Sequence, residues 1–267
     1  MTQPQVALSQ DFFDALIDIP REKQKKLNKM IREFRRNPES SSINYEKIND
    51  AANPQFRSVR LDQEYRGIVL KPERGNVYVL LWVDKHDDAY DWARRHRCEI
   101  KPETGSLQLY EVMREGSEAG AEATATTSPE PSAGDQPLIG ARERELRGLG
   151  VPEDRLEAVQ ALTSQTELDA MESRLPVEAF EALCFLAEGL SMEEVQKEYA
   201  VADEPQQVDT TDISAALERD HSRRRFHVVE DDEELTRMLE APLEQWRVFL
   251  HPSQRRLVER DWNGPVR

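Results

Sequence analysis

The chain has few of the features that mark secreted, membrane or disulfide-bonded proteins. Its 267 residues include only two cysteines, Cys98 and Cys184, which stand far apart and lack the spacing of metal ligands. No apolar run approaches the ~18 residues of a membrane span, and the N-terminus lacks the hydrophobic core of a signal peptide. We therefore expect a reduced, cytoplasmic protein with no structural disulfide, no metal site and no membrane partner.

The chain also lacks an excess of positive charge. Its formal net charge is -16, and the deficit is unevenly spread. Residues 1–112 hold 19 Lys/Arg against 18 Asp/Glu, whereas residues 113–267 hold 17 against 34. This acidic total argues against non-specific nucleic-acid binding by the whole chain, but it allows a local basic face in the first part.

A segment poor in large apolar side chains divides the chain. Residues 113–137 are small, polar and rich in Pro and Gly. Such a segment cannot bury enough surface to offset the entropy of ordering it, so we predict a flexible linker. It separates a domain at 1–112 from a small helical bundle at 138–205 and a further segment at 206–267.

Hydrophobic periodicity predicts an α+β fold for the first domain and a mostly helical region after the linker. The turn sequences between the middle strands favour an antiparallel meander. In the last segment we expect a short strand at Phe226–Val229 and an acidic helix at Glu233–Leu239. The elements expected in the first domain are a strand at Val6–Leu8, a helix capped by Ser9, a helix within Arg21–Arg36, strands near Phe56–Leu61, Tyr65–Lys71 and Val77–Val83, a helix near Asp88–Arg95 and a strand near Leu107–Val112.

Two sets of basic residues are candidates for contact with a polyanion. The predicted helix from Arg21 to Arg36 holds eight Lys/Arg and two Glu, which favours phosphate contacts that position RNA without reading its sequence. The second set lies on the predicted strands, where guanidinium groups suit bidentate phosphate contacts. The candidates are Lys25, Lys26, Lys29 and Arg32 on the helix, and Arg57, Arg60 and Arg66 on the strands.

The turn after these strands adds residues that can exchange protons. RNA cleavage by a 2′-hydroxyl needs a base, cations for the developing charge and an acid for the leaving oxygen. His86 or Tyr90 can supply the proton transfers, and Arg60 and Arg66 can hold the charge.

Both basic sets also have a purely structural alternative. The helix can present an ordinary solvated face. On the strands, Arg57 and Arg60 can pair with acids of the neighbouring turns, namely Asp62, Glu64 or Asp87.

The element order, the YRGIVL strand and the HDDAY turn resemble the RelE/ParE toxin superfamily over about residues 5–112. The resemblance implies two helices on an antiparallel sheet, in a family that includes ribosome-dependent messenger-RNA interferases and gyrase poisons. Arg66 matches the conserved arginine after the central hairpin, and Arg60 matches a basic position on the preceding strand. His86 and Tyr90 fall where the family has its C-terminal basic residue and aromatic. Two features depart from the family, because Ser58 replaces a lysine and the basic tail is missing.

A second resemblance lies near the end of the sequence. Phe249-Leu250 followed by the run His251–Arg256 is similar to the Q motif of UvrD-like superfamily 1 helicases. The resemblance implies that Gln254 reads the adenine edge of ATP. The phosphate-cradling loop that follows in the family is not part of the sequence, which stops at Arg267. We thus expect no cofactor in this chain, with ATP and magnesium needed only if a helicase core follows.

These patterns leave three hypotheses open. The first is the regulatory or targeting region of a UvrD-like DNA helicase, docking on RNA, the ribosome or a protein partner through residues 1–112, while DNA is bound by a helicase core. The second is a RelE-type messenger-RNA endonuclease restrained by its own acidic C-terminal half. The third is a non-catalytic protein-interaction module.

Overall fold

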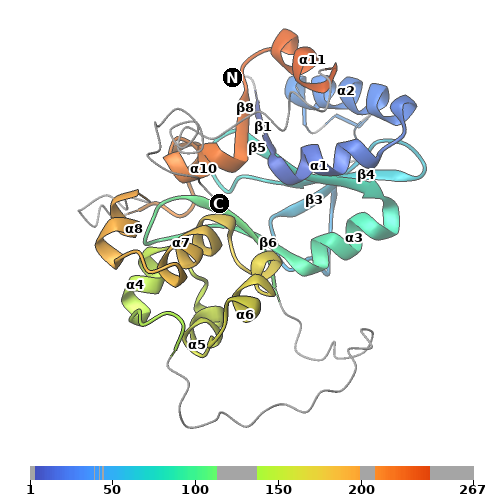
Figure 1. Cartoon of the computed structure of the whole chain (residues 1–267). Coiled ribbons are helices and arrows are strands. Elements are labelled where there is room, and N and C mark those ends of the chain that lie inside the picture. Colours follow the sequence, from blue (N-terminus) through green and yellow to red (C-terminus); the bar gives the residue numbers. More distant parts are fainter. Residues whose placement is uncertain are drawn as a thin grey trace, which may run out of the picture.

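The computed structural model describes residues 4–38, 40, 41, 43, 45–112, 137–198 and 208–240 (Figure 1). The predicted linker lies outside the described residues except for its last position, residue 137. The Q-motif-like stretch with Gln254 lies entirely outside them. None of the described helices is both long enough and apolar enough to span a membrane.

The described residues form an α+β structure with a mixed six-stranded sheet and a separate two-stranded sheet. The strands are β1 (Gln5–Ser9), β2 (Glu46–Lys47), β3 (Phe56–Arg60), β4 (Tyr65–Leu70), β5 (Val77–Lys85), β6 (His96–Ile100), β7 (Leu107–Glu111) and β8 (Phe226–Val229). The helices are α1 (Gln10–Asp18), α2 (Arg21–Arg36), α3 (His86–Arg95), α4 (Glu143–Gly148), α5 (Leu156–Gln160), α6 (Gln165–Asp169), α7 (Val177–Ala187), α8 (Met192–Glu198), α9 (Ile213–Leu217), α10 (Asp220–Arg225) and α11 (Asp232–Glu240), with short 3₁₀ turns at Glu153–Arg155 and Glu172–Arg174.

The large sheet has the order β2-β3-β4-β5-β1-β8. The predicted meander is confirmed, because β3, β4 and β5 pair antiparallel. The prediction of a wholly antiparallel sheet was wrong, since β1 runs parallel to β5. No hairpin joins these two strands: the chain leaves β1 through two helices and returns at the far side of the sheet, which permits parallel pairing.

Helices cover both faces of this sheet (Figure 1). On one face, the apolar stripe of α2 packs with residues of α1 and α11, and Leu27, Ile31 and Phe34 are fully buried. On the other face α3 packs through Ala89, Trp92 and Ala93, beside the β6–β7 pair and α9. Ser9 caps α1 as predicted, since its Oγ accepts the N–H of Phe12 at 3.1 Å.

Residues 208–240 complete the N-terminal part of the fold. The predicted strand at Phe226–Val229 is confirmed, and it pairs antiparallel with β1 along the edge of the sheet. The acidic helix α11 follows and packs beside α2, with Leu235 fully buried in the shared core (Figure 1). No pattern in the sequence had indicated which strand β8 would pair with.

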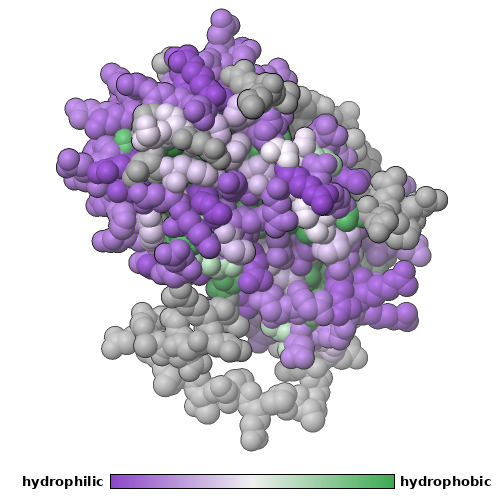
Figure 2. All heavy atoms as spheres, turned by 180° about the vertical axis from the view of Figure 1, so that it is seen from behind, coloured by the Kyte–Doolittle hydropathy of each residue, from purple (hydrophilic) through white to green (hydrophobic). Residues whose placement is uncertain are grey.

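The described part of the predicted bundle, residues 138–198, is helical and has its own apolar core. It lies against the sheet region through polar contacts, among them Arg155 Nη2 donating to the carbonyl of Glu111 at 3.3 Å. Seen from behind, hydrophilic residues cover most of the surface and hydrophobic residues show only in small separate spots (Figure 2). The described residues on this face therefore form no broad apolar patch.

Candidate nucleic-acid interface

The β3–β4 hairpin places Arg60 directly opposite Arg66. Residues opposite each other on neighbouring strands point to the same face, so the two guanidiniums stand side by side. Arg60 is exposed and Arg66 half-buried. Like charges in this position are unfavourable unless an anion lies between them, which makes the pair a candidate anion site.

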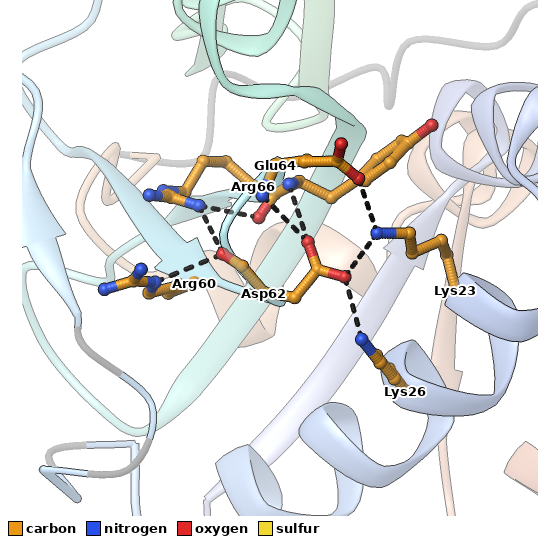
Figure 3. Close-up of polar contacts among 7 residues, drawn as sticks. Lys23, Lys26, Arg60, Asp62, Glu64 and Arg66 are labelled. Carbon is orange, nitrogen blue, oxygen red and sulfur yellow. Dashed lines mark hydrogen bonds and ion pairs between the residues drawn. The ribbon is translucent and has the colours of Figure 1, made fainter.

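Both arginines donate to one oxygen, the backbone carbonyl of Asp62 in the hairpin turn (Figure 3). The N···O distances are 3.1 Å from Arg60 Nε and 2.7 Å from Arg66 Nη1. Among the described residues, no carboxylate lies within ion-pair distance of either guanidinium. The structural alternative, in which Arg60 pairs with a turn acid, is thus wrong, because Asp62 offers its carbonyl and turns its carboxylate elsewhere.

The Asp62 carboxylate points toward α2 (Figure 3). Its Oδ2 accepts from Lys23 Nζ at 2.7 Å and from Lys26 Nζ at 3.0 Å, while Oδ1 accepts the N–H groups of Glu64 and Tyr65. Burial works against ionisation, but the hydrogen bonds from Lys23, the Glu64 N–H and Lys26 together hold the pKa of Asp62 well below its usual range. The carboxylate therefore stays charged and keeps both lysines close to the turn.

Helix α3 brings His86 and Tyr90 to the same end of the hairpin. The backbone N–H of His86 donates to the carbonyl of Glu64 at 2.7 Å, which fixes the start of the helix beside the turn. One turn later, the Tyr90 hydroxyl lies 3.0 Å from Ser58 Oγ, two residues from Arg60 on the same face of β3. The rings of His86 and Tyr90 stack with centroids 4.5 Å apart.

An aromatic stack holds α3 on the sheet. The Trp92 ring lies between Trp82 of β5 and His96, with centroid distances of 5.5 Å and 4.2 Å. The helix also has acids in its first turn and arginines in its last turn, which suits the helix dipole. These contacts set the position of His86 and Tyr90 beside the arginine pair.

The predicted strand arginines do not all share one face. Arg57 alternates with Ser58 and so projects from the opposite side of β3, where its Nη1 donates to the carbonyls of Pro54 and Phe56 at 2.8 Å. Gly67, next to Arg66, also lies on that side, where a Cβ would meet Val59 at 2.9 Å. A side chain larger than hydrogen would push the two strands apart there.

The predicted basic residues of α2 fall into separate groups. Lys25 and Lys29 are exposed on the side of the helix that faces away from the core. Lys26 is bound to Asp62, and Arg32 Nη2 donates to the hydroxyl of Thr236 on α11. Because α2 packs on the opposite face of the sheet from α3, Lys25 and Lys29 do not share a surface with the arginine pair.

From the sequence, Asp62 was expected only as a turn residue or as an alternative ion-pair partner of the strand arginines. The available signal was an Asp directly after a predicted strand, a position where its side chain commonly accepts backbone N–H groups of the turn. Among the described residues, no group of three His, Cys, Asp or Glu side chains is placed to hold a metal ion. Two guanidiniums placed side by side can bind one phosphate through charge-assisted hydrogen bonds.

Comparison with known proteins found no family model, no curated protein and no solved structure that matches this chain.

Proposed function

We propose that the face formed by Arg60, Arg66, His86 and Tyr90 binds the phosphate backbone of RNA. The observation that carries the proposal is the cross-strand arginine pair, whose two guanidiniums have no carboxylate partner among the described residues. The paired charges repel each other in the free protein, and a phosphate between them removes that cost and adds charge-assisted hydrogen bonds. The aromatic stack beside them, with His86 exposed and Tyr90 half-buried, offers a surface for an unpaired base.

Binding without cleavage is the better-supported form of this proposal. The Tyr90 hydroxyl is engaged with Ser58, and the His86 Nδ1 lies 2.8 Å from a carboxylate oxygen of Asp87. Cleavage needs a general base and a general acid for its two proton transfers, and in this structure the Tyr90 hydroxyl and the His86 Nδ1 are already engaged with Ser58 and Asp87. The RelE-like resemblance adds the ribosome as the setting in which such a surface meets messenger RNA.

The helicase part of the proposal is that this region targets a UvrD-like DNA helicase to RNA, the ribosome or a protein partner. It is supported by the similarity of the residues around Gln254 to the Q motif. The coding sequence downstream of Arg267 tests it. A strand running into a glycine-rich phosphate loop is the expected result, and unrelated sequence there contradicts it.

A second candidate function is a RelE-type ribonuclease restrained by its own acidic half. The specific observation that favours it is the packing of acidic α11 against basic α2, where Asp232 pairs with Arg35. Incubation of ribosome-bound message with the full chain, as the wild type and as Asp232→Asn, which removes the charge that pairs with Arg35, tests it. Cleavage that appears only in Asp232→Asn and is abolished when His86→Ala is added supports this function.

The direct test of RNA binding uses the full chain and a labelled single-stranded oligouridylate of about a dozen nucleotides. Arg60→Ala/Arg66→Ala is expected to weaken binding at least tenfold, since each charge-assisted hydrogen bond contributes about 1.5–3 kcal/mol. The slope of binding against salt should also fall by about 1 for each phosphate that the variant no longer binds. Arg57→Ala, on the opposite face of β3, is the matched control and should bind like the wild type. Equal affinity of the double variant and the wild type contradicts the proposal.

A further inference from the structure

Asp62 has two sets of contacts that face in opposite directions. Its backbone carbonyl accepts from Arg60 and Arg66, whereas its side chain accepts from Lys23 and Lys26 on α2 (Figure 3). The two arginines are therefore hydrogen-bonded to the neutral backbone carbonyl of Asp62. The two lysines instead form ion pairs with its carboxylate.

The side chain also fixes the shape of the turn. Oδ1 accepts the N–H of Glu64 at 2.9 Å and that of Tyr65 at 3.1 Å, and the backbone N–H of Leu61 donates to the carbonyl of Tyr65 at 3.1 Å. An aspartate that accepts from the backbone two and three residues ahead holds a tight turn in one conformation. That conformation directs the Asp62 carbonyl toward the arginine face.

The carbonyl in turn holds the two guanidiniums. Arg60 uses only its Nε in hydrogen bonds to described residues, and Arg66 uses only its Nη1, which donates to the Tyr65 carbonyl at 3.0 Å as well as to that of Asp62. Arg60 Nη1 and Nη2, and Arg66 Nε and Nη2, are thus left to donate to a ligand. Both guanidinium groups are held in position before an anion binds. This lowers the entropy cost of binding, since long side chains lose rotamer freedom on ordering.

We infer that Asp62 is the positioning residue of the RNA site: its Oδ1 fixes the hairpin turn, and through the carbonyl this holds Arg60 and Arg66 ready for one phosphate. Its carboxylate has a second effect, because it binds Lys26 and, together with Glu64, Lys23, and so keeps these two lysines from competing for the phosphate. This inference rests on the proposed function of the same face. The strongly lowered pKa of Asp62 agrees with a carboxylate that stays ionised and bound.

Two substitutions separate the turn-fixing role of Asp62 from its charge. Asp62→Asn keeps an oxygen that can accept the Glu64 and Tyr65 N–H groups but loses the charge that binds the lysines. Asp62→Glu keeps the charge, but its longer side chain is displaced from the turn. If Asp62 acts by positioning, Asp62→Asn binds the oligouridylate at least as tightly as the wild type, because the turn is kept and one negative charge is removed. Asp62→Glu then binds about fivefold or more weakly, as expected for looser charge-assisted hydrogen bonds.

The comparison is made on the full chain, with thermal unfolding recorded for each variant. In the Arg60→Ala/Arg66→Ala background, Asp62→Glu should cause no further loss of affinity. A general loss of structure would lower the affinity in that background as well. If Asp62→Glu is not folded, Asp62→Ser takes its place, since its hydroxyl accepts only part of the turn's N–H groups and should give a smaller loss. The nuclear magnetic resonance signal of the Arg60 Nε–H should shift in the weakened variant and stay in place in Asp62→Asn.

The outcomes distinguish the inference from the function on which it rests. Wild-type affinity in Asp62→Glu, together with at least tenfold weaker binding in the double arginine variant, overturns the positioning role and leaves RNA binding standing. Equal losses of affinity in Asp62→Asn and Asp62→Glu also overturn it, because the charge and not the turn would then decide affinity. Unchanged binding in the double arginine variant overturns both. Equal affinity for a DNA oligonucleotide of the same length leaves the positioning role intact and removes RNA as the specific ligand.

Discussion

Arg60 and Arg66 face each other across two antiparallel strands and both donate to the backbone carbonyl of Asp62. This relationship differs from an ordinary surface ion pair, in which each cation has its own carboxylate. The nearest acid of the turn, Asp62, is bound to lysines on the other side of the hairpin. The fold of the hairpin therefore sets the positions of Arg60 and Arg66. It also determines which basic residues of the chain can contact one ligand together.

The exposed lysines of α2 are predicted to contribute little to binding of a short RNA. Lys25 and Lys29 lie on a helix that packs on the opposite face of the sheet from the arginine pair. At physiological salt, exposed charges separated by more than about 8 Å are largely screened from each other. Lys25→Gln/Lys29→Gln should thus change the affinity for a short oligouridylate by less than about twofold, a fraction of 1 kcal/mol.

The measurement is fluorescence anisotropy, with Arg60→Ala/Arg66→Ala as the comparison. A longer RNA that passes round the hairpin turn should become sensitive to the two lysines. A loss of affinity for the short oligonucleotide as large as that of the double arginine variant would place α2, and not the sheet face, on the path of the RNA.

A second prediction concerns the hydrogen bond between Ser58 and Tyr90. Ser58 is buried at 1% exposure, so Tyr90→Phe leaves its hydroxyl without this partner and should lower the free energy of unfolding by about 1–3 kcal/mol. Adding Ser58→Ala to Tyr90→Phe removes the unsatisfied group and should restore part of that stability. Urea unfolding of the two single variants and the double variant measures this coupling. Strictly additive losses of stability would mean that the two hydroxyls do not interact.

Much of the N-terminal fold was predictable because local signals agree with the tertiary structure. The apolar stripe of α2 and the turn sequences between β3, β4 and β5 appear directly in the sequence, and these elements formed where expected. Strand β6 was missed because it begins directly after α3 with no turn residue between them, although the alternation of polar and apolar residues in HRCEI is typical of a strand. The pairing of β8 with β1 was also missed, since the two strands are separated by more than 200 residues in sequence and neither one specifies the other.

The candidate site was predictable only in part, for a similar reason. The residue types at Arg60, Arg66, His86 and Tyr90 could be read from the sequence, but their shared face depends on the register of β3 with β4 and on the packing of α3. Arg57 shows the limit: it lies only three residues from Arg60, yet the alternation of the strand sends it to the other face. The separate roles of the Asp62 carbonyl and carboxylate cannot be read from a residue type at all.

A third prediction is that residues 1–112 are unstable when produced alone. The edge of β1 that pairs with β8 would be exposed, and the core would lose Phe226, Val229 and Leu235, each of which is almost fully buried. Burying such side chains contributes about 1.5–3 kcal/mol each, so the loss is a large part of an ordinary domain's stability. Unpaired strand edges also favour aggregation.

Thermal unfolding and light scattering of the fragment, with and without a synthetic peptide of residues 208–240, test this point. The peptide should raise the unfolding midpoint and reduce scattering, and the same peptide with Leu235→Asp should do neither. A fragment as stable as the whole chain would show that the C-terminal strand and helix add nothing to the core.

A fourth prediction concerns Glu178 in the first turn of α7. The residue is buried at 4% exposure, and its Oε2 has no hydrogen bond among the described residues. Burial raises its pKa, against the opposing effect of the nearby Arg225 guanidinium, which itself is bound to Asp11. Between the ordinary glutamate pKa of 4.5 and the raised value, the folded chain binds more protons than the unfolded chain. The contribution of Glu178 to stability is therefore full below about pH 4.5 and is lost as the pH rises through the raised value.

Glu178→Gln should remove this dependence, so that the variant matches the wild type near pH 4 and is more stable than the wild type at neutral pH. Glu181→Gln is the matched control on the same helix: its carboxylate lies 3.7 Å from Arg224 and is partly exposed, so only a small change is expected. The free energy of unfolding in urea, measured across this pH range, decides the matter. A Glu178→Gln variant less stable than the wild type at neutral pH would mean that attraction to Arg225 and Arg224 outweighs the cost of burying the charge. The bundle would then be held to the sheet region by that charge pair.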